Sequence, residues 1–242
     1  MESLVIVYDN RATEGFKADW GFSALVELED ELILFDTGAS PEVLKENLEL
    51  AEVAPEEIDV VFISHNHWDH TGGLPFILER NREVELFVPE SSCSYFEELL
   101  PETAVCVPVS EPVKISERAL STGVLPTGMD NPKEEQALIV GTPSGYLLLV
   151  GCAHPGIVEI AKKAVSLVGE ELFLIVGGFH LYNSPKEETE KVAEELLNLT
   201  RFVAPCHCTG DVGIEVFRRT FGDRFIEVKA GVEIPLEEDV NV

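Results

Sequence analysis

The amino-acid sequence predicts an α/β protein, and two patterns carry this prediction. Short runs rich in branched apolar residues alternate with segments of helical apolar spacing over residues 41–107 and again after residue 150. Between these regions, over residues 113–150, the helical spacing disappears, and short β-rich runs separated by Pro and Gly turns indicate a second sheet. The chain therefore combines strand–helix alternation with an additional group of strands.

The length and composition favour a single domain spanning residues 1–242. A chain of 242 residues, of which 45% are hydrophobic, can bury a substantial core without disulfides. Its five cysteines are an odd number scattered along a long chain, so reduced thiols are the simpler interpretation. The first ten residues hold only a short apolar run, and no later run reaches about 18 residues. We therefore expect a cytoplasmic protein without a signal peptide or a membrane span.

The net charge narrows the choice of partners. The chain has 17 Lys and Arg against 45 Asp and Glu, which gives a formal net charge of -28. This charge repels phosphate backbones and anionic lipid surfaces, so we expect neither a nucleic-acid partner nor a membrane partner. The lack of a basic run also disfavours a nuclease. The oligomeric state cannot be read from the sequence.

The first half of the chain opens with strands and then alternates strands with helices. We expect strands at residues 4–8, 21–28, 32–35, 58–63, 84–88 and 104–107. We expect helices at residues 41–53, 74–80 and 92–100. The acidic turn at 29–31 makes the first strands antiparallel, and Pro41 occupies an acceptable first-turn position. Cys93 and Cys106 fall within these elements, so we interpret both as core residues.

The second half of the chain continues the pattern with different connections. We expect strands at residues 119–125, 137–140, 146–150, 172–176, 202–204 and 225–228, and helices at 157–168, 185–199 and 212–221. Residues 127–136 form a polar, turn-rich segment between two of these strands. Such a segment can fold over a site as a lid, although its usual role is only to connect.

All six histidines directly follow predicted strands. They are His65, His67, His70, His154, His180 and His207. Loops at the carboxyl ends of strands gather in one crevice in layered α/β folds, so we expect these loops to converge on one site. His65 and His67 are two residues apart, and in extended backbone both imidazoles point to the same side and can meet one cation.

The donor set suits a binuclear metal centre, whose two ions lie about 3.5–4 Å apart. Such a centre needs roughly six to seven protein ligands. We assign one metal ion to His65, His67 and His154, and the other to Asp69, His70 and His207. Zinc is the first choice of ion, and manganese or iron also suit imidazole and carboxylate ligands.

His180 is left for substrate binding or proton transfer, and with Asp69 it is a candidate catalytic residue. In the alternative arrangement His180 is a ligand, and His154 or His207 lies behind the ligands. Asp36 ends the strand at 32–35 and either supports the loop of residues 65–70 by hydrogen bonds or caps a turn.

Two cysteines flank His207. In extended backbone Cys206 and Cys208 would point away from its imidazole, which favours packing over ligation.

The segment HNHWDH at residues 65–70, followed by TGGL, resembles the HxHxDH signature of the metallo-β-lactamase superfamily. With GFSALVE, LFDTG, GCAHPGIV, GGFHL and PCHCTG, the whole chain is similar to the branch around 7,8-dihydropterin-6-methyl-4-(β-D-ribofuranosyl)aminobenzene-5'-phosphate synthase. This resemblance implies a four-layer αβ/βα sandwich of two mixed sheets flanked by helices, with a metal site at one edge. It also implies a small organic phosphate or diphosphate as substrate, and it favours the supporting role for Asp36.

The sequence departs from the wider superfamily at two places. The usual hydrolases carry a metal-bridging aspartate in a Gly-Asp pair after a late strand, where this chain has Gly151-Cys152. Their frequent Gly-His motif is also missing, and Pro126-Thr127-Gly128 stands nearby without a histidine. Cys152 is therefore either an additional ligand, as a thiolate, or a buried structural thiol.

The leading hypothesis is a hydrolase in which two metal ions activate water against a small phosphate or ester. In the alternative, the same ions bind the diphosphate leaving group of a pterin, and the enzyme is a transferase that releases pyrophosphate. A di-iron redox enzyme is less favoured, because members of that kind resemble proteins with an appended flavin domain and an extra carboxylate ligand. A non-catalytic metal-binding protein is also less favoured, since the ligand set is intact.

Overall fold

The computed structural model describes residues 2–236. Its strands are β1 (Ser3–Tyr8), β2 (Ser23–Leu28), β3 (Glu31–Phe35), β4 (Val60–Phe62), β5 (Glu85–Pro89), β6 (Val105–Val109), β7 (Val113–Lys114), β8 (Ala119–Pro126), β9 (Glu134–Thr142), β10 (Gly145–Val150), β11 (Leu172–Gly178), β12 (Thr200–Cys206) and β13 (Glu233–Pro235). Its α-helices are α1 (Pro41–Leu50), α2 (Trp68–Thr71), α3 (Leu74–Arg80), α4 (Cys93–Glu97), α5 (Ile157–Val168), α6 (Lys186–Leu196) and α7 (Gly210–Phe221). Short 3-10 helices lie at Pro55–Glu57, Glu90–Ser92, His207–Thr209 and Gly222–Arg224.

The described strands form two mixed sheets. The first has seven strands in the order β13-β1-β2-β3-β4-β5-β6, antiparallel from β13 to β3 and parallel from β3 to β6. The second has six strands in the order β12-β11-β10-β9-β8-β7, parallel from β12 to β10 and antiparallel from there to β7. Each sheet thus joins an antiparallel meander to parallel strands that need crossover connections.

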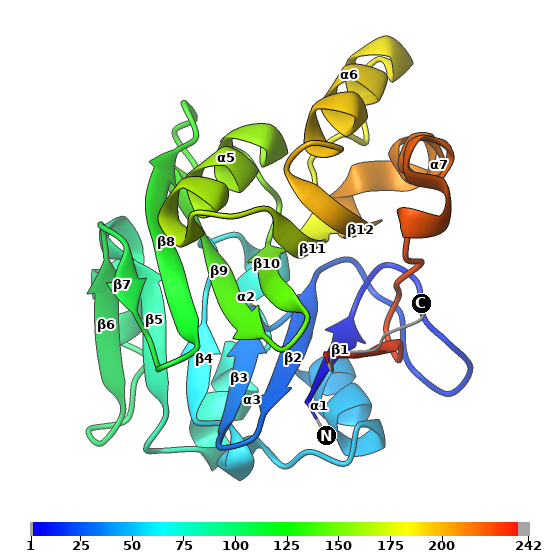
Figure 1. Ribbon diagram of the computed structural model, residues 1–242. Helices are drawn as coiled ribbons and strands as arrows, with labels where there is room; N and C mark the ends of the chain where they lie inside the picture. Colours follow the sequence, from blue (N-terminus) through cyan, green and yellow to red (C-terminus); the bar gives the residue numbers. More distant parts are fainter. Residues whose placement is uncertain (1, 237–242) are drawn as a thin grey trace.

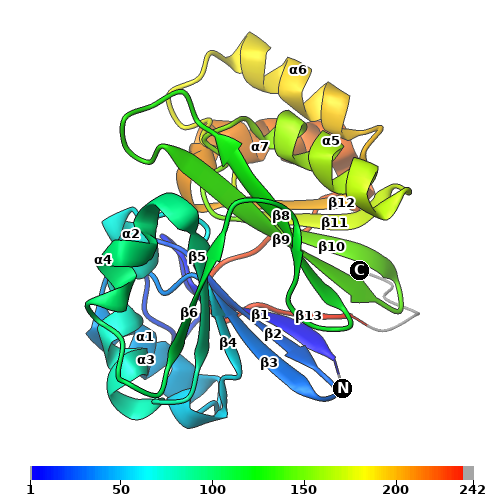
Figure 2. The same ribbon diagram turned by 90° about the vertical axis from the view of Figure 1, so that its left-hand side faces the viewer.

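The two sheets pack face to face, and helices cover both outer faces (Figures 1 and 2). Alternate residues of β10 show the layering, because Leu147 and Leu149 face the other sheet while Leu148 and Val150 face the helices. Helices α1, α3 and α4 cover the first sheet, and α5, α6 and α7 cover the second. This arrangement confirms the prediction of a four-layer αβ/βα sandwich.

Several predicted elements differ in the structure, and the helices expected at 41–53 and 185–199 end early, at Leu50 and Leu196. The strand expected at residues 225–228 is wrong, since Phe225 makes only one isolated bridge, to Val203, and the last strand is β13. A three-residue strand ending in proline has too little periodicity to recognise, and its partner β1 is distant in sequence. The helix expected at 92–100 ends early, at Glu97, in the segment that leads to Pro101.

Within residues 2–236, no helix is both long and apolar enough to cross a lipid bilayer.

The aromatic packing of α7 gives a test of the outer core. Phe217 is fully buried, and its ring lies 5.2 Å from that of Phe179. We expect Phe217→Ala to lower the free energy of unfolding by about 3–5 kcal/mol, because it removes a buried ring and leaves a cavity. Val212→Ala on the same helix is the control, with an expected change within about 0.5 kcal/mol since Val212 is 64% exposed. Urea unfolding measures both, and equal losses would contradict the packing.

Candidate metal site

Four loops bring the histidines into one cluster. These loops follow β4, β10, β11 and β12 at their carboxyl ends. The closest ring centroids are those of His65 and His70, at 4.2 Å, and of His154 and His180, at 4.5 Å. The remaining contacts are His65–His67 at 4.7 Å, His65–His154 at 4.8 Å, His67–His154 at 4.9 Å and His70–His207 at 5.1 Å. Residues that are up to 142 positions apart in sequence therefore share one site.

Asp36 holds the loop that carries the first three histidines. This fully buried residue has a φ of 52° at the end of β3, and its carboxylate turns toward the end of β4. It accepts hydrogen bonds from the Ser64 amide (2.8 Å), the Ser64 hydroxyl (2.7 Å) and His70 Nδ1 (2.7 Å). Burial alone would lower the pKa of His70, but the charge and hydrogen bond of Asp36 outweigh it and raise that pKa to about 9.

Ser64 extends this hydrogen-bond chain to His65. Because its hydroxyl donates to Asp36, it accepts from His65 Nδ1 at 2.9 Å, which assigns the proton of that imidazole to Nδ1. His65 Nε2 is buried and finds no hydrogen-bond partner among residues 2–236. Burial and the neighbouring imidazoles lower the pKa of His65 well below its ordinary value. A neutral imidazole with a free, buried Nε2 lone pair is suited to bind a cation.

Glu135 binds the Nδ1 side of the His154 imidazole, as Asp36 binds that of His70. Its buried carboxylate accepts the backbone N–H groups of Cys152 (2.9 Å), Ala153 (2.8 Å) and His154 (2.8 Å), and it accepts His154 Nδ1 at 2.8 Å. Burial alone would raise the pKa of Glu135, but these hydrogen bonds outweigh it and lower the pKa. Sequence reasoning missed Glu135 within the polar segment 127–136, and its only signal was an acidic residue starting an apolar strand.

His207 is held from the first sheet. Its Nδ1 lies 3.0 Å from Asn10 Oδ1, and its backbone N–H donates to Asp9 Oδ1 at 2.9 Å. Its buried Nε2 lies 3.4 Å from Asp69 Oδ2 and makes no hydrogen bond within the described part of the chain. Asp9 and Asn10 were missed, although Asp9 directly follows the apolar run of β1 as Asp36 follows that of β3.

Asp69 lies between two histidines and an indole. Its Oδ2 is 3.9 Å from His70 Nε2 and accepts the Trp20 indole N–H at 2.8 Å. Burial alone would raise the pKa of Asp69, but its close contact with His207 and the positive charge of His70 outweigh burial and lower that pKa. Asp69 is therefore an anionic group within the cluster. Trp20, which orients it, was not found from the sequence.

Cys152 lies at the centre of the cluster. Its sulfur is 3.2 Å from His70 Nε2. Three groups of possible metal ligands include this residue, and within each group the donor atoms lie within 4.8 Å of one another. The groups are His65, Cys152 and His154; His70, Cys152 and His207; and Cys152, His180 and Cys208. The first two groups meet at the Cys152 sulfur.

The extended backbone on which the interpretation of Cys208 was based is not present in the structure. The backbone does not stay extended through His207, whose φ is 47°, so the alternation of side chains breaks there. The Cys208 sulfur instead accepts the backbone N–H of His180 at 3.3 Å. Cys206, on the regular part of β12, packs between the two sheets.

The remaining two histidines are more accessible. His67 is half-buried, and its Nε2 lies 3.3 Å from the carbonyl oxygen of Asn131. Part of the segment 127–136 therefore touches the site. His180 is exposed, has a φ of 53°, and lies beside Tyr182 with ring centroids 5.7 Å apart.

Close backbone approach explains the glycines of the signature. A Cβ at Gly72 would lie 2.0 Å from the carbonyl oxygen of Ala39, and a Cβ at Gly151 would lie 2.1 Å from Ser64 Oγ. Glycine at these positions lets the segment after β3, and the turn after β10, press against the histidine loop.

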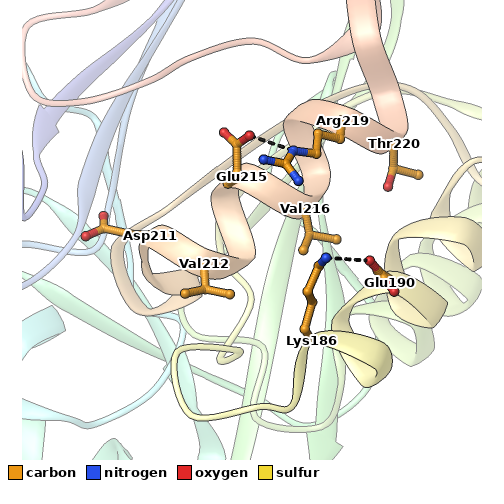
Figure 3. A pocket seen from close by; sticks show the side chains of 8 residues that line it. All are labelled: Lys186, Glu190, Asp211, Val212, Glu215, Val216, Arg219 and Thr220. Carbon is orange, nitrogen blue, oxygen red and sulfur yellow. Dashed lines mark hydrogen bonds and ion pairs between the residues drawn. The ribbon is translucent and has the colours of Figure 1, made fainter.

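A hollow of about 380 Å³ adjoins the His207 side of the cluster. His207, Trp20, Tyr182, Asn10 and Arg11 line it, together with residues at the start of α7. A separate hollow of about 380 Å³ lies between α6 and α7 and is lined by charged and small side chains (Figure 3). Its walls carry the ion pairs Lys186–Glu190 and Arg219–Glu215 and none of the histidines, so it is not part of the site.

Comparisons with known proteins agree with this geometry. The family model of the metallo-beta-lactamase superfamily matches residues 21–158. The 7,8-dihydropterin-6-methyl-4-(beta-D-ribofuranosyl)-aminobenzene-5'-phosphate synthase of Methanocaldococcus jannaschii is 28% identical over 263 residues, covering 89% of this chain and 90% of that protein. Ribonuclease Z of Pyrococcus abyssi is 34% identical over 84 residues, covering 32% of this chain and 26% of that protein.

A solved structure extends the likeness to the whole fold. It is the crystal structure of Tm1679, a metal-dependent hydrolase of the beta-lactamase superfamily, with a TM-score of 0.83 and 27% identity. The match covers 98% of this chain and 100% of that one. Because the family model also spans more than half of the sequence, the chain belongs to the metallo-beta-lactamase superfamily.

Proposed function

We propose that this protein is a two-metal hydrolase that acts on a small organic phosphate or ester. The observation that carries this proposal is a pair of buried nitrogens, His65 Nε2 and His207 Nε2, that make no hydrogen bond within residues 2–236. Burying a polar atom without a hydrogen bond costs about 1–3 kcal/mol. Two such nitrogens in one cluster are therefore expected only where a bound ligand contacts them. Divalent metal binding is general in this superfamily, and it fits these donors.

Two kinds of side-chain contact support the ligand sets proposed from the sequence. Ring contacts join the three histidines of the first set, and Asp69 Oδ2 lies 3.9 Å from His70 Nε2 and 3.4 Å from His207 Nε2. His65, His67 and His154 would hold one ion, and Asp69, His70 and His207 the other. Cys152 lies between the two sets and would bind both ions as a thiolate, in place of the usual aspartate. The group of Cys152, His180 and Cys208 leaves the alternative open in which His180 is a ligand.

The roles of the protein groups follow from their surroundings. Bound divalent ions supply Lewis acidity, which makes water nucleophilic at neutral pH and offsets the charge of a phosphate. Asp69, with its lowered pKa, contributes the anionic charge that a pair of cations needs. His180 is exposed beside His154, so it can donate a proton to the leaving group.

The hollow beside His207 suits the organic part of such a substrate. Trp20 and Tyr182 supply aromatic surface, being 43% and 50% exposed. Arg11 also lines the hollow, and its guanidinium is paired with Asp9 and Glu227. A volume of about 380 Å³ fits a small molecule, and the overall charge disfavours a polynucleotide. The relative from Methanocaldococcus jannaschii, named for a pterin-derived phosphate, supports a phosphate-bearing substrate.

The same relative favours a second candidate function, a dihydropterin transferase. In that reaction, the proposed ions would bind the diphosphate of a pterin diphosphate. The diphosphate would leave as pyrophosphate when the aminobenzene acceptor attacks the carbon that carried it.

Removal of the Cys152 sulfur tests the binuclear centre. We expect about two equivalents of zinc, manganese or iron per wild-type chain, measured by elemental analysis on protein prepared without chelators. Cys152→Ala should retain about one equivalent or fewer, because both ions lose a shared ligand, and Cys152→Asp should retain both. Cys206→Ala is the matched control, since Cys206 packs between the sheets. Two equivalents in Cys152→Ala would show that this thiol is structural.

The proposed acid is tested by varying the leaving group. For His180→Ala we expect kcat to fall about 10²- to 10⁴-fold on an alkyl phosphate, whose leaving group needs a proton. The loss should be much smaller on p-nitrophenyl phosphate, which leaves as a stable anion. Metal content is measured alongside and should be unchanged. Equal losses on both substrates, or loss of metal, would remove the proton-donor role.

Hydrolysis and transfer are separated by the need for an acceptor. With a hydroxymethyl-dihydropterin diphosphate, we expect a hydrolase to release phosphate or pyrophosphate whether or not an aminobenzene compound is present. Release of pyrophosphate only when the acceptor is added, with a stoichiometric pterin–aminobenzene product, would replace hydrolysis with transfer. Chromatography of the products distinguishes the two reactions.

A further inference from the structure

Two cysteines lie side by side far from the histidine cluster. Cys93 begins α4, Cys106 lies on β6, and their sulfur atoms are 3.0 Å apart. This distance is about 1 Å longer than a disulfide bond of about 2.05 Å. The thiols were predicted to be core residues, but Cys106 is only partly buried, and its neighbour Val105 is 50% exposed.

A disulfide between Cys93 and Cys106 would join a short helix to an edge strand. Strand β6 is the edge of the seven-stranded sheet and pairs with β5 alone among the described strands. Helix α4 has only five residues and packs against β6, with Tyr95 and Leu99 largely exposed nearby. Phe96 and Cys93 are the buried residues of this short helix, and a cross-link at Cys93 would fix the helix to the edge strand.

We propose that Cys93 and Cys106 form a disulfide that joins α4 to β6. Cys106, the more accessible thiol, reacts first as its thiolate with a low-molecular-weight disulfide, forms a mixed disulfide and releases one thiol. The Cys93 thiolate then attacks the Cys106 sulfur and releases the second thiol. Two protein thiols and one small disulfide give one protein disulfide and two small thiols, so the atoms and the two electrons balance.

The protonation of Cys106 sets the speed of this exchange. Burial and the neighbouring Cys93 thiol raise the pKa of Cys106 above its ordinary value. Since the thiolate is the nucleophile, the pair should oxidise slowly at neutral pH and faster as the pH rises.

A second pair of neighbouring thiols competes with Cys93 and Cys106 for the oxidant. Cys152 and Cys208 also lie close together, but they belong to the histidine cluster. The test must therefore show which sulfurs are oxidised as well as how many.

The experiment counts free thiols in the full-length protein before and after incubation with oxidised glutathione. The protein is then unfolded, and the thiols are titrated and mapped by differential alkylation and mass spectrometry. We expect the wild type to fall from five thiols to three, with Cys93 and Cys106 protected together. Cys106→Ser should keep all four of its thiols, whereas Cys93→Ser should lose the Cys106 thiol alone, as a mixed disulfide with glutathione that no second thiol resolves. The control Cys206→Ala should fall from four thiols to two.

Thermal unfolding supplies an independent readout. Closing the loop from Cys93 to Cys106 should raise the Tm of the oxidised wild type by about 6 to 12 °C over the reduced form. Reductant should abolish the difference, and Cys106→Ser should show none. Five thiols remaining after oxidation, or protection that maps to Cys152 and Cys208, would overturn the proposal.

Discussion

Hydrogen bonds at Nδ1 hold four imidazoles of the site, and the rest of its architecture depends on them. Ser64, Asp36, Glu135 and Asn10 are the partners of His65, His70, His154 and His207, respectively. Each partner takes up the Nδ1 side of its ring, so the Nε2 atoms turn toward a common centre. Two of these partners are fully buried carboxylates, Asp36 and Glu135, and they come from different sheets.

Buried carboxylates are costly unless several donors surround them, and the local backbone supplies those donors. Glu135 binds three successive backbone N–H groups in the turn after β10, where Ala153 has a φ of 57°. Left-handed backbone recurs at Asp36, His180 and His207, each next to the carboxyl end of a strand of the site. Each such residue costs roughly 1–3 kcal/mol, and packing between the two sheets must offset it. Strain concentrated at one edge of the sandwich is typical of a functional site.

The substitution of cysteine for the usual bridging aspartate changes the chemistry of the proposed centre. A thiolate is a softer ligand than a carboxylate and favours zinc or iron over magnesium or calcium. It also supplies one negative charge between the proposed ions, as the aspartate would. Within the proposed function, Asp69 and Cys152 would thus share the charge compensation, while Arg11 and the aromatic wall face the substrate. Part of the chain is similar to ribonuclease Z, and the whole chain has a formal net charge of -28.

The fold class, the order of most elements and the placement of every histidine after a strand could be predicted from the sequence. These features are predictable because β and helical periodicities are local, and parallel strands end at a common edge. The support of His154 by Glu135, the contacts of Asp9 and Asn10 with His207, and the position of Cys208 at the site became visible in the folded chain alone. These contacts join residues up to 198 positions apart or depend on a single backbone angle at His207. Neither a long-range contact nor one left-handed residue leaves a periodic trace in the sequence, because each is fixed by packing between the two sheets.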